Sequence, residues 1–277
     1  MEWLVGADRA SVLTSFSAIM YLASQPRDDK VVYPRMYLAA VHEIFVLTLT
    51  ICWTISLVWT PDLVMNHPAR VGITGHFNPC YGWDYPPASY VAVTMISLNV
   101  YFSFRYAWLE STRVNMVAAS KKQGIQSFGD RFSTITAYNL ALASCFTLLL
   151  WLIGPNDGNW LVHTMIFVYY AISSYLAALG NYLEAASGPW KHMIETKHRV
   201  YIVTYGLSLA SLAVVYPTNT FVVDVAPALF QIADAVWLIH MLVEQKFAPP
   251  QPPMRITVEL VLGEEAESLA SKPRAMV

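Results

Sequence analysis

A few ionisable side chains lie inside long apolar stretches, and these are the residues best placed for chemistry. Asp234 is near the middle of the apolar run 223–245, and Gln231 precedes it by three positions. On a helix these two side chains share a face, whereas His240 is turned away from them. An ionisable group at the centre of a bilayer costs roughly 2.5 to 3.5 kcal/mol to insert, so it marks an interior position. Asp234 is therefore predicted to point into a helix bundle.

Two roles for Asp234 follow from this position, and the sequence leaves both open. In the first, Asp234 lines a polar pocket within the bundle. In the second, it makes a structural hydrogen bond to a side chain on another helix, as polar residues often do in membrane proteins. Asn139 is the first partner that we expect for this bond, and Asn181 is the alternative.

His163, Asp224 and Arg105 are further candidates for binding a lipid or a partner. His163 and Asp224 each lie near the start of an apolar run, and both are expected at one membrane surface, where they would form a headgroup site or an acid/base pair. The alternative is a solvated histidine and an Asp224 that only caps a helix N-terminus, where an anion is favoured. At the other surface, Arg105 is predicted to reach the headgroups and Glu110 to be solvated. A lipid-phosphate site at Arg105 is the alternative there.

The sequence contains no motif of a metal centre, a cofactor site or a self-contained catalytic machine. His42, His163 and His240 fall on different apolar runs at different depths, and no HExxH, CxxC, Walker or GxSxG motif occurs. We therefore expect no metal, no cofactor and no catalytic activity carried by this chain alone. Whether it is an enzyme stays open at this stage.

The amino-acid composition is that of an integral membrane protein. The chain has 277 residues, of which 56% are hydrophobic and 13% are charged, and its mean hydropathy is +0.41. An average soluble domain is about 45 to 50% apolar and about 25% charged. The net charge of −2 and the three cysteines argue against a basic nucleic-acid-binding protein and against a small disulfide scaffold.

Six apolar runs are long enough to cross a bilayer, which takes roughly 20 helical residues. A weaker run, 10–24, is too short and too rich in serine and threonine to span, so a surface helix is predicted there. The sequence thus predicts an all-α protein, a polytopic six-helix transmembrane bundle. The six runs cover residues 36–58, 88–109, 132–153, 160–183, 200–217 and 223–245.

The distribution of lysine and arginine predicts the orientation of the bundle. Fifteen of the seventeen cations lie before residue 36, in the connections 110–131 and 184–199, or after residue 245. Cytoplasmic segments carry such an excess, so both termini are expected in the cytoplasm. This divides the chain into a cytoplasmic segment (1–35), a membrane domain (36–247) with a structured luminal loop (59–87), and a flexible cytoplasmic tail (248–277).

Three stretches resemble the Frag/DRAM/Sfk superfamily of membrane proteins. GHFNPCYGWDYPPASYVAVTMISLNVYFSFRYAWLE resembles the first loop and second span of the family, and YNLALASCFTLLLWLIGPNDGNWLVHTMIFVYYAISSYLAALGNYL is similar to its third and fourth spans. ALFQIADAVWLIHMLVEQKF resembles its last span. The resemblance covers about residues 36–260. The residues at the family's positions are Pro86, Pro87, Arg105, Tyr106, Asn139, His163 and Asp234.

The resemblance implies a six-span protein of the Golgi or endoplasmic reticulum, with the lysosome or plasma membrane as alternatives. Spans three to six look closer to the branch that remodels the lipid of glycosylphosphatidylinositol (GPI) anchors, so a GPI-anchor remodelling factor is the first expectation. Its partners would be membrane lipids, and GPI-anchored proteins or a remodelling enzyme, with no nucleic acid. The alternative is a regulator of the DRAM or Sfk type that acts in autophagy or phosphoinositide metabolism.

Overall fold

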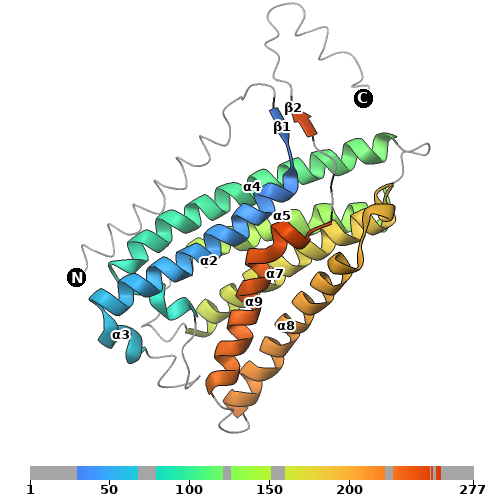
Figure 1. Ribbon diagram of the computed structural model, residues 1–277. Helices are drawn as coiled ribbons and strands as arrows, with labels where there is room; N and C mark the ends of the chain where they lie inside the picture. Colours follow the sequence, from blue (N-terminus) through green and yellow to red (C-terminus); the bar gives the residue numbers. More distant parts are fainter. Residues whose placement is uncertain are drawn as a thin grey trace, which may run out of the picture.

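The computed structural model describes residues 30–67, 79–120, 126–150, 160–221, 227–249, 251 and 254–256, and these form a bundle of long helices (Figure 1). Two short segments near the chain ends pair as a small sheet. The helices are α2 (Pro34–Trp59), α3 (Pro61–Met65), α4 (Ala88–Ser120), α5 (Phe128–Leu148), α7 (Trp160–Ser187), α8 (Thr196–Phe221) and α9 (Pro227–Phe247). The short 3-10 helices are η2 (Pro79–Trp83) and η3 (Lys191–Met193), and the strands are β1 (Lys30–Val32) and β2 (Met254–Ile256).

Local sequence signals set where several helices begin. Pro34 opens α2, where the missing N–H of proline is not needed. Ser127 and Asp130 form a capping box at the start of α5: the Ser127 hydroxyl accepts the Asp130 N–H at 3.2 Å, and the Asp130 carboxylate accepts the Ser127 N–H at 2.7 Å. Before α8, the Glu195 N–H donates to Nδ1 of His198 at 3.0 Å.

Each long helix packs against its neighbour in the sequence, and the first also packs against the last. The contacts join α2 to α4, α4 to α5, α5 to α7, α7 to α8, α8 to α9, and α9 back to α2. The long helices therefore form a closed ring. We call the end of the bundle that carries α3 and η2 the outer end, and the end that carries the β1–β2 sheet and η3 the inner end (Figure 1).

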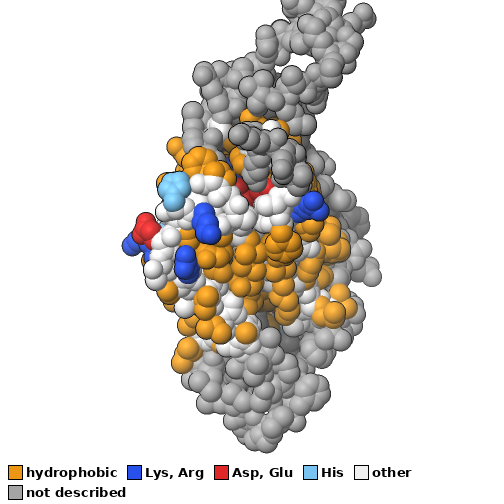
Figure 2. Space-filling view, turned by 90° about the vertical axis from the view of Figure 1, so that its right-hand side faces the viewer, with side chains coloured by type: hydrophobic (Ala, Val, Ile, Leu, Met, Phe, Trp, Pro, Cys, Tyr) orange, Lys and Arg blue, Asp and Glu red, His pale blue; other side chains and the backbone are white. Residues whose placement is uncertain are grey.

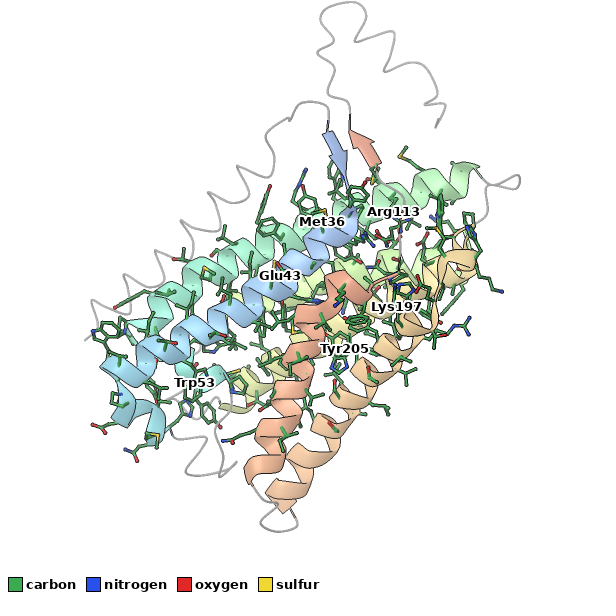
Figure 3. All side chains as sticks on the ribbon, in the orientation of Figure 1. Met36, Glu43, Trp53, Arg113, Lys197 and Tyr205 are labelled. Carbon is green, nitrogen blue, oxygen red and sulfur yellow. The ribbon has the colours of Figure 1, made fainter. Side chains whose placement is uncertain are left out.

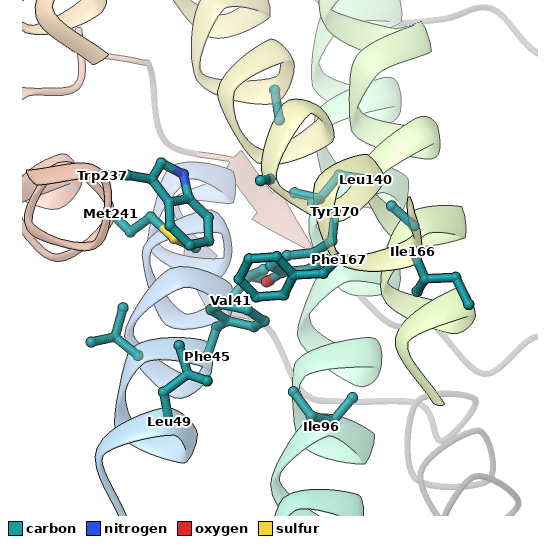
Figure 4. Packing of buried hydrophobic residues seen from close by; sticks show 14 of the residues in the cluster. Val41, Phe45, Leu49, Ile96, Leu140, Ile166, Phe167, Tyr170, Trp237 and Met241 are labelled. Atoms are coloured by element: carbon teal, nitrogen blue, oxygen red, sulfur yellow. The ribbon is translucent and has the colours of Figure 1, made fainter. Parts of the chain in front are cut away.

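An aromatic cluster at the centre of the bundle joins α2, α7 and α9 (Figure 4), and Trp83 of η2 belongs to the same core. Phe45 of α2 stacks on Tyr170 of α7 with ring centroids 4.4 Å apart. Trp83 of η2 and Trp237 of α9 meet Phe45 edge-on at 5.7 and 6.1 Å, and Phe167 meets Trp237 at 5.5 Å. Through Trp83, the outer-end segment η2 is packed into the same core as the helices.

The all-α class predicted from the sequence is confirmed, and the described parts of the six expected runs lie in the long helices, apart from residues 149 and 150 just after α5. Two of these, Pro34–Trp59 and Val162–Ser187, are long and apolar enough to cross a membrane. The other four spans and the six-span topology stay predictions. The surface helix expected at 10–24 lies outside the described residues.

The first part of the tail, for which we expected flexibility, lies against the inner end of the bundle. Gln251 is buried and donates to the Asn181 side chain at 3.1 Å. Strand β2 then pairs antiparallel with β1, so that Met254 lies opposite Val32. Proline-rich composition does not reveal this pairing, because the partner strand lies more than 200 positions earlier in the chain. The flexibility of the tail stays a prediction.

Candidate functional site

Asp234 faces the interior, as predicted, and lies in a pocket near the outer end. Its side chain is buried, and Gln231 from the preceding turn lines the same pocket. The pocket has a volume of about 250 Å³ and is open toward the outside of the bundle. Apart from Asp234 and Gln231, the lining residues are Val46, Leu49, Thr50, Trp53, Pro79, Ala235 and Leu238. Asp234 therefore faces α2 and η2.

The hydrogen bond expected between Asp234 and Asn139 is not formed. Asn139 faces α7, where its amide donates to the Ser173 hydroxyl at 2.7 Å and its carbonyl oxygen accepts from the Tyr169 hydroxyl at 2.7 Å. The alternative partner, Asn181, accepts a hydrogen bond from a tyrosine of α4 at 2.9 Å. Asn139 is thus bonded to α7 and the Asn181 oxygen to α4, whereas Asp234 lies on α9, which is across the ring of helices from α5.

Asp84, which the sequence did not single out, lies between two imidazole rings. Its Oδ2 is 2.9 Å from Nε2 of His67, and its Oδ1 is 3.6 Å from Nε2 of His163. All three side chains are buried. Tyr81 stacks on the His67 ring with centroids 4.1 Å apart and an angle of 8° between the planes. We call His67, Asp84 and His163 the Asp84 cluster.

The Asp84 cluster depends on the docking of η2 against the outer part of α2, where Trp53 lies (Figure 3). The Trp53 indole donates to the Pro79 carbonyl at 2.7 Å, and the Ser56 hydroxyl donates to the Gly82 carbonyl at 2.6 Å. A Cβ atom on Gly82 would lie 2.7 Å from Cγ of Trp53, so only glycine allows this approach. These contacts place Asp84 directly after a fixed segment.

Electrostatic interactions link the Asp84 cluster to the Asp234 pocket. Burial raises the pKa of the Cys80 thiol well above its usual value, and the negative charges of Asp84 and Asp234 raise it further. Burial, followed by Asp84, likewise raises the pKa of Tyr85 to about 12. Both carboxylates thus act on one thiol, and the Cys80 thiol stays protonated at neutral pH. It is unsuited to be a nucleophile, because the thiolate is the reactive form.

His163 is the member of the cluster that a ligand could use. Neither of its ring nitrogens makes a hydrogen bond within the described part of the chain, although the side chain is buried. A neutral imidazole presents one donor and one acceptor, which suit a hydroxyl or a phosphate oxygen. Asp224, the expected partner of His163, lies outside the described residues, so that pair stays a prediction. Among the described residues, no group of three or more His, Cys, Asp or Glu side chains could hold a metal ion.

At the inner end, Arg105 and Glu110 lie in different surroundings. The Arg105 guanidinium lies over the Trp108 ring at 5.1 Å and the Tyr37 ring at 6.0 Å. Glu110, which we expected to be solvated, is fully buried and accepts from Arg113 at 2.6 Å. The prediction was wrong because Arg113 lies one turn further along α4 and neutralises the carboxylate.

Arg113 also binds a second glutamate, Glu184 of α7, which the sequence alone did not connect to it. The guanidinium donates to both Glu184 oxygens at 3.2 and 3.0 Å. The neighbouring Glu110 and Glu184 carboxylates raise the pKa of Arg113 above its usual value, against the opposing effect of burial. The Ser133 hydroxyl donates to Glu110 at 2.8 Å, so the network joins α4, α5 and α7.

In comparisons with known proteins, no family model, no curated protein and no solved structure matches this chain.

Proposed function

We propose that this chain is an integral membrane protein with six spans, whose outer end lies on the luminal side of the Golgi or endoplasmic reticulum. The support is a set of large apolar side chains that are more than half exposed on the helices. An apolar band also covers the face shown in Figure 2. An exposed apolar surface of this kind indicates contact with lipid or a partner. Examples from five helices are Leu57, Ile135, Met165, Leu207 and Ile239.

The site at the outer end is best suited to a lipid-linked substrate, and we assign it to the lipid remodelling or maturation of GPI anchors. One observation carries this assignment: a buried carboxylate with two imidazoles follows directly after η2, and the first residue of η2, Pro79, lines an open pocket whose walls are largely apolar. The apolar walls suit an acyl chain, and the polar groups suit the hydroxyls and the phosphate of the anchor. The sequence resemblance to the branch that remodels GPI lipids supports the same substrate.

In this proposal the chain holds the substrate, and a partner enzyme carries out the transfer. The Cys80 thiol is protonated, and Asp84 is already shared by two imidazoles. His163 is the residue that contacts the substrate, through a hydrogen bond to a headgroup oxygen. The described residues at the outer end therefore suit binding and orientation better than a complete reaction cycle.

The test uses cells that lack the chain and carry a GPI-anchored reporter protein. The lipid of the reporter's anchor is measured by mass spectrometry. We expect the wild-type chain to restore the remodelled lipid, and His163→Ala to fail although the protein is made and inserted normally. The matched control is His240→Ala, because His240 bonds Thr204 on α8 at 2.9 Å and lies outside the site. Full rescue by His163→Ala would refute the assignment of the site.

The same cells test the DRAM- or Sfk-like alternative. If the anchors are normal in cells without the chain, while autophagic flux or phosphoinositide levels change, the chain is a regulator and the GPI assignment is wrong.

A further inference from the structure

A second candidate site lies at the inner end, on the opposite side of the bundle from the Asp84 cluster. It is a groove of about 450 Å³ between the start of α2, η3, the start of α8 and the end of α9. The charged or titratable side chains that line it are Arg35, His192, Glu195, Lys197, His198 and Lys246. We call this the inner groove.

The inner groove concentrates positive charge in a chain whose net charge is −2. Arg35, Lys197 and Lys246 come from three different helices, so the fold brings these cations together. Among the described residues that line the groove, Glu195 is the one carboxylate, and it pairs with Lys197 at 3.0 Å, where the lysine side chain is 47% exposed and the glutamate side chain 63%. One carboxylate leaves two of the three cations uncompensated in the groove.

The start of α8 adds to this positive potential. The first turn of the helix carries basic residues and no acidic one, and the carboxylate of Glu195, just before the helix, is paired with Lys197. A helix N-terminus bears a partial positive charge, so acidic side chains are the usual choice there and basic ones are unfavourable without an anion. Burial, followed by the nearby charge of Lys197, lowers the pKa of His198, and Arg35 acts in the same direction. Two cations from separate helices thus act on one ring in this groove.

The groove lies where the apolar surface of the bundle ends. Along α8, exposed valine and leucine side chains begin at Val200, one turn after the groove residues, and continue through Val203 and Leu207. On α9, Ile239 and Leu242 are exposed just before Lys246. Figure 2 shows lysine, arginine and histidine side chains gathered along one edge of the apolar band. In a membrane this edge is at the depth of the lipid headgroups.

We propose that the inner groove binds the phosphate group of an anionic lipid headgroup in the cytoplasmic leaflet. Lysine and arginine side chains donate charge-assisted hydrogen bonds to phosphate oxygens, and a helix N-terminus supplies backbone N–H groups for the same anion. Basic pockets at the cytoplasmic side of membrane helices are suited to phosphorylated headgroups. This inference does not depend on the assignment of the outer end to GPI anchors.

The experiment measures binding to the purified full chain in detergent micelles. The probes are a short-chain phosphatidylinositol 4-phosphate, a short-chain phosphatidylcholine and inorganic phosphate. We expect the phosphoinositide to bind at least tenfold more tightly than either of the others. The triple variant R35Q/K197Q/K246Q should weaken phosphoinositide binding by at least tenfold. The variant K197R/K246R, which keeps the charges, should retain binding.

The matched control is R131Q/K191Q, which removes two cations outside the groove and is compared with the double groove variant R35Q/K246Q. It should bind the phosphoinositide as the wild type does, and thermal melting verifies that each variant is folded. If the control weakens phosphoinositide binding as much as the groove variant does, only net charge matters, and the proposal that the inner groove is the binding site is wrong. Unchanged binding by the groove variant, or no binding to the wild type, would also overturn it. If inorganic phosphate binds as tightly as the lipid and is lost in the groove variant, the site stands and its ligand is a soluble phosphate.

Discussion

Asp84 accepts interactions from two histidines that come from different parts of the chain. His67 follows α3, and His163 lies in the first turns of α7, so the carboxylate ties the loop to the bundle. Buried polar groups are destabilising when they lose their partner, because the cost of desolvation is then not offset. The Asp84 cluster is therefore both a structural link and the polar part of the proposed substrate site.

The first prediction concerns the charge of Asp84. Asp84→Asn keeps the size of the side chain but removes the negative charge between the two imidazoles. We expect the variant to lose about 1 to 3 kcal/mol of stability and to fail in restoring the remodelled GPI lipid. The comparison is Asp62→Asn, the same change at an exposed carboxylate in the first turn of α3. Equal melting temperatures and equal rescue for the two variants would contradict a role for the cluster.

The second prediction concerns pH and His198. Its Nδ1 accepts the Glu195 N–H, which requires that this nitrogen carries no proton, and burial lowers the pKa of the ring. The unfolded chain, with the ordinary histidine pKa near 6.5, binds more protons than the folded chain as the pH falls through this range, so stability falls with it. We expect the melting temperature of the purified protein to drop between pH 7.5 and 5.5.

A side chain at position 198 that does not titrate separates the effect of protonation from the effect of the hydrogen bond to the Glu195 N–H. His198→Asn should show a smaller drop between the two pH values, and it should lose about 0.5 to 1.5 kcal/mol at pH 7.5 from the weakened bond before α8. His192→Asn, at an exposed histidine of η3, should leave the pH dependence unchanged. If His198→Asn melts with the same pH dependence as the wild type, the ring does not control this part of the stability.

Helices α5 and α7 approach each other closely because small residues lie between them. A Cβ atom on Gly180 would be 2.5 Å from Oγ1 of Thr136 and 2.9 Å from the Cα of Ser133. A backbone atom cannot move aside without shifting the whole helix. Small residues at such positions are a common device of membrane helices, since they allow close packing and hydrogen bonds between helices.

The third prediction follows from this contact. Gly180→Ala should destabilise the protein by about 1 to 3 kcal/mol, as overpacking does in a well-packed core. Gly206→Ala is the control, because its added Cβ meets the far end of the Tyr175 side chain, which can rotate away. Alanine also favours a helix over glycine by about 1 kcal/mol at both positions. If both variants melt at the same temperature, the approach of α5 to α7 is not limited by Gly180.

The elements show which features a sequence can reveal and which it cannot. The apolar runs predicted the long helices, because hydrophobic runs and helical length are local properties of the chain. The run ending at residue 109 gave no sign that α4 continues to Ser120, because Arg113 is stabilised there by Glu184 of another helix. The burial of Asp234 was predictable from the cost of exposing a carboxylate to lipid. The pairing of Asp84 with His163 was not, since it needs the docking of η2 on α2.

The two ends of the bundle carry different kinds of charged side chain. The outer end has the buried Asp84 cluster and the Asp234 pocket, whereas the inner end has the cationic inner groove. An apolar surface on the helices lies between them. This order matches a chain that crosses the bilayer with its cations toward the cytoplasm, where lysine and arginine are enriched.

The last prediction is the orientation that follows from this asymmetry. With an even number of spans, residues 1 and 277 and the inner groove lie in the cytoplasm, and the loop 59–87 lies in the lumen. In sealed vesicles with the cytoplasmic face outward, tags at either terminus should be cleaved by added protease. A glycosylation sequon inserted in the loop at the exposed Asn66 should be modified, because the modification occurs on luminal segments, whereas one inserted beside Lys191 should not. A tag at residue 1 that is protected until detergent is added would mean an odd number of spans, with the run at 10–24 as the additional helix.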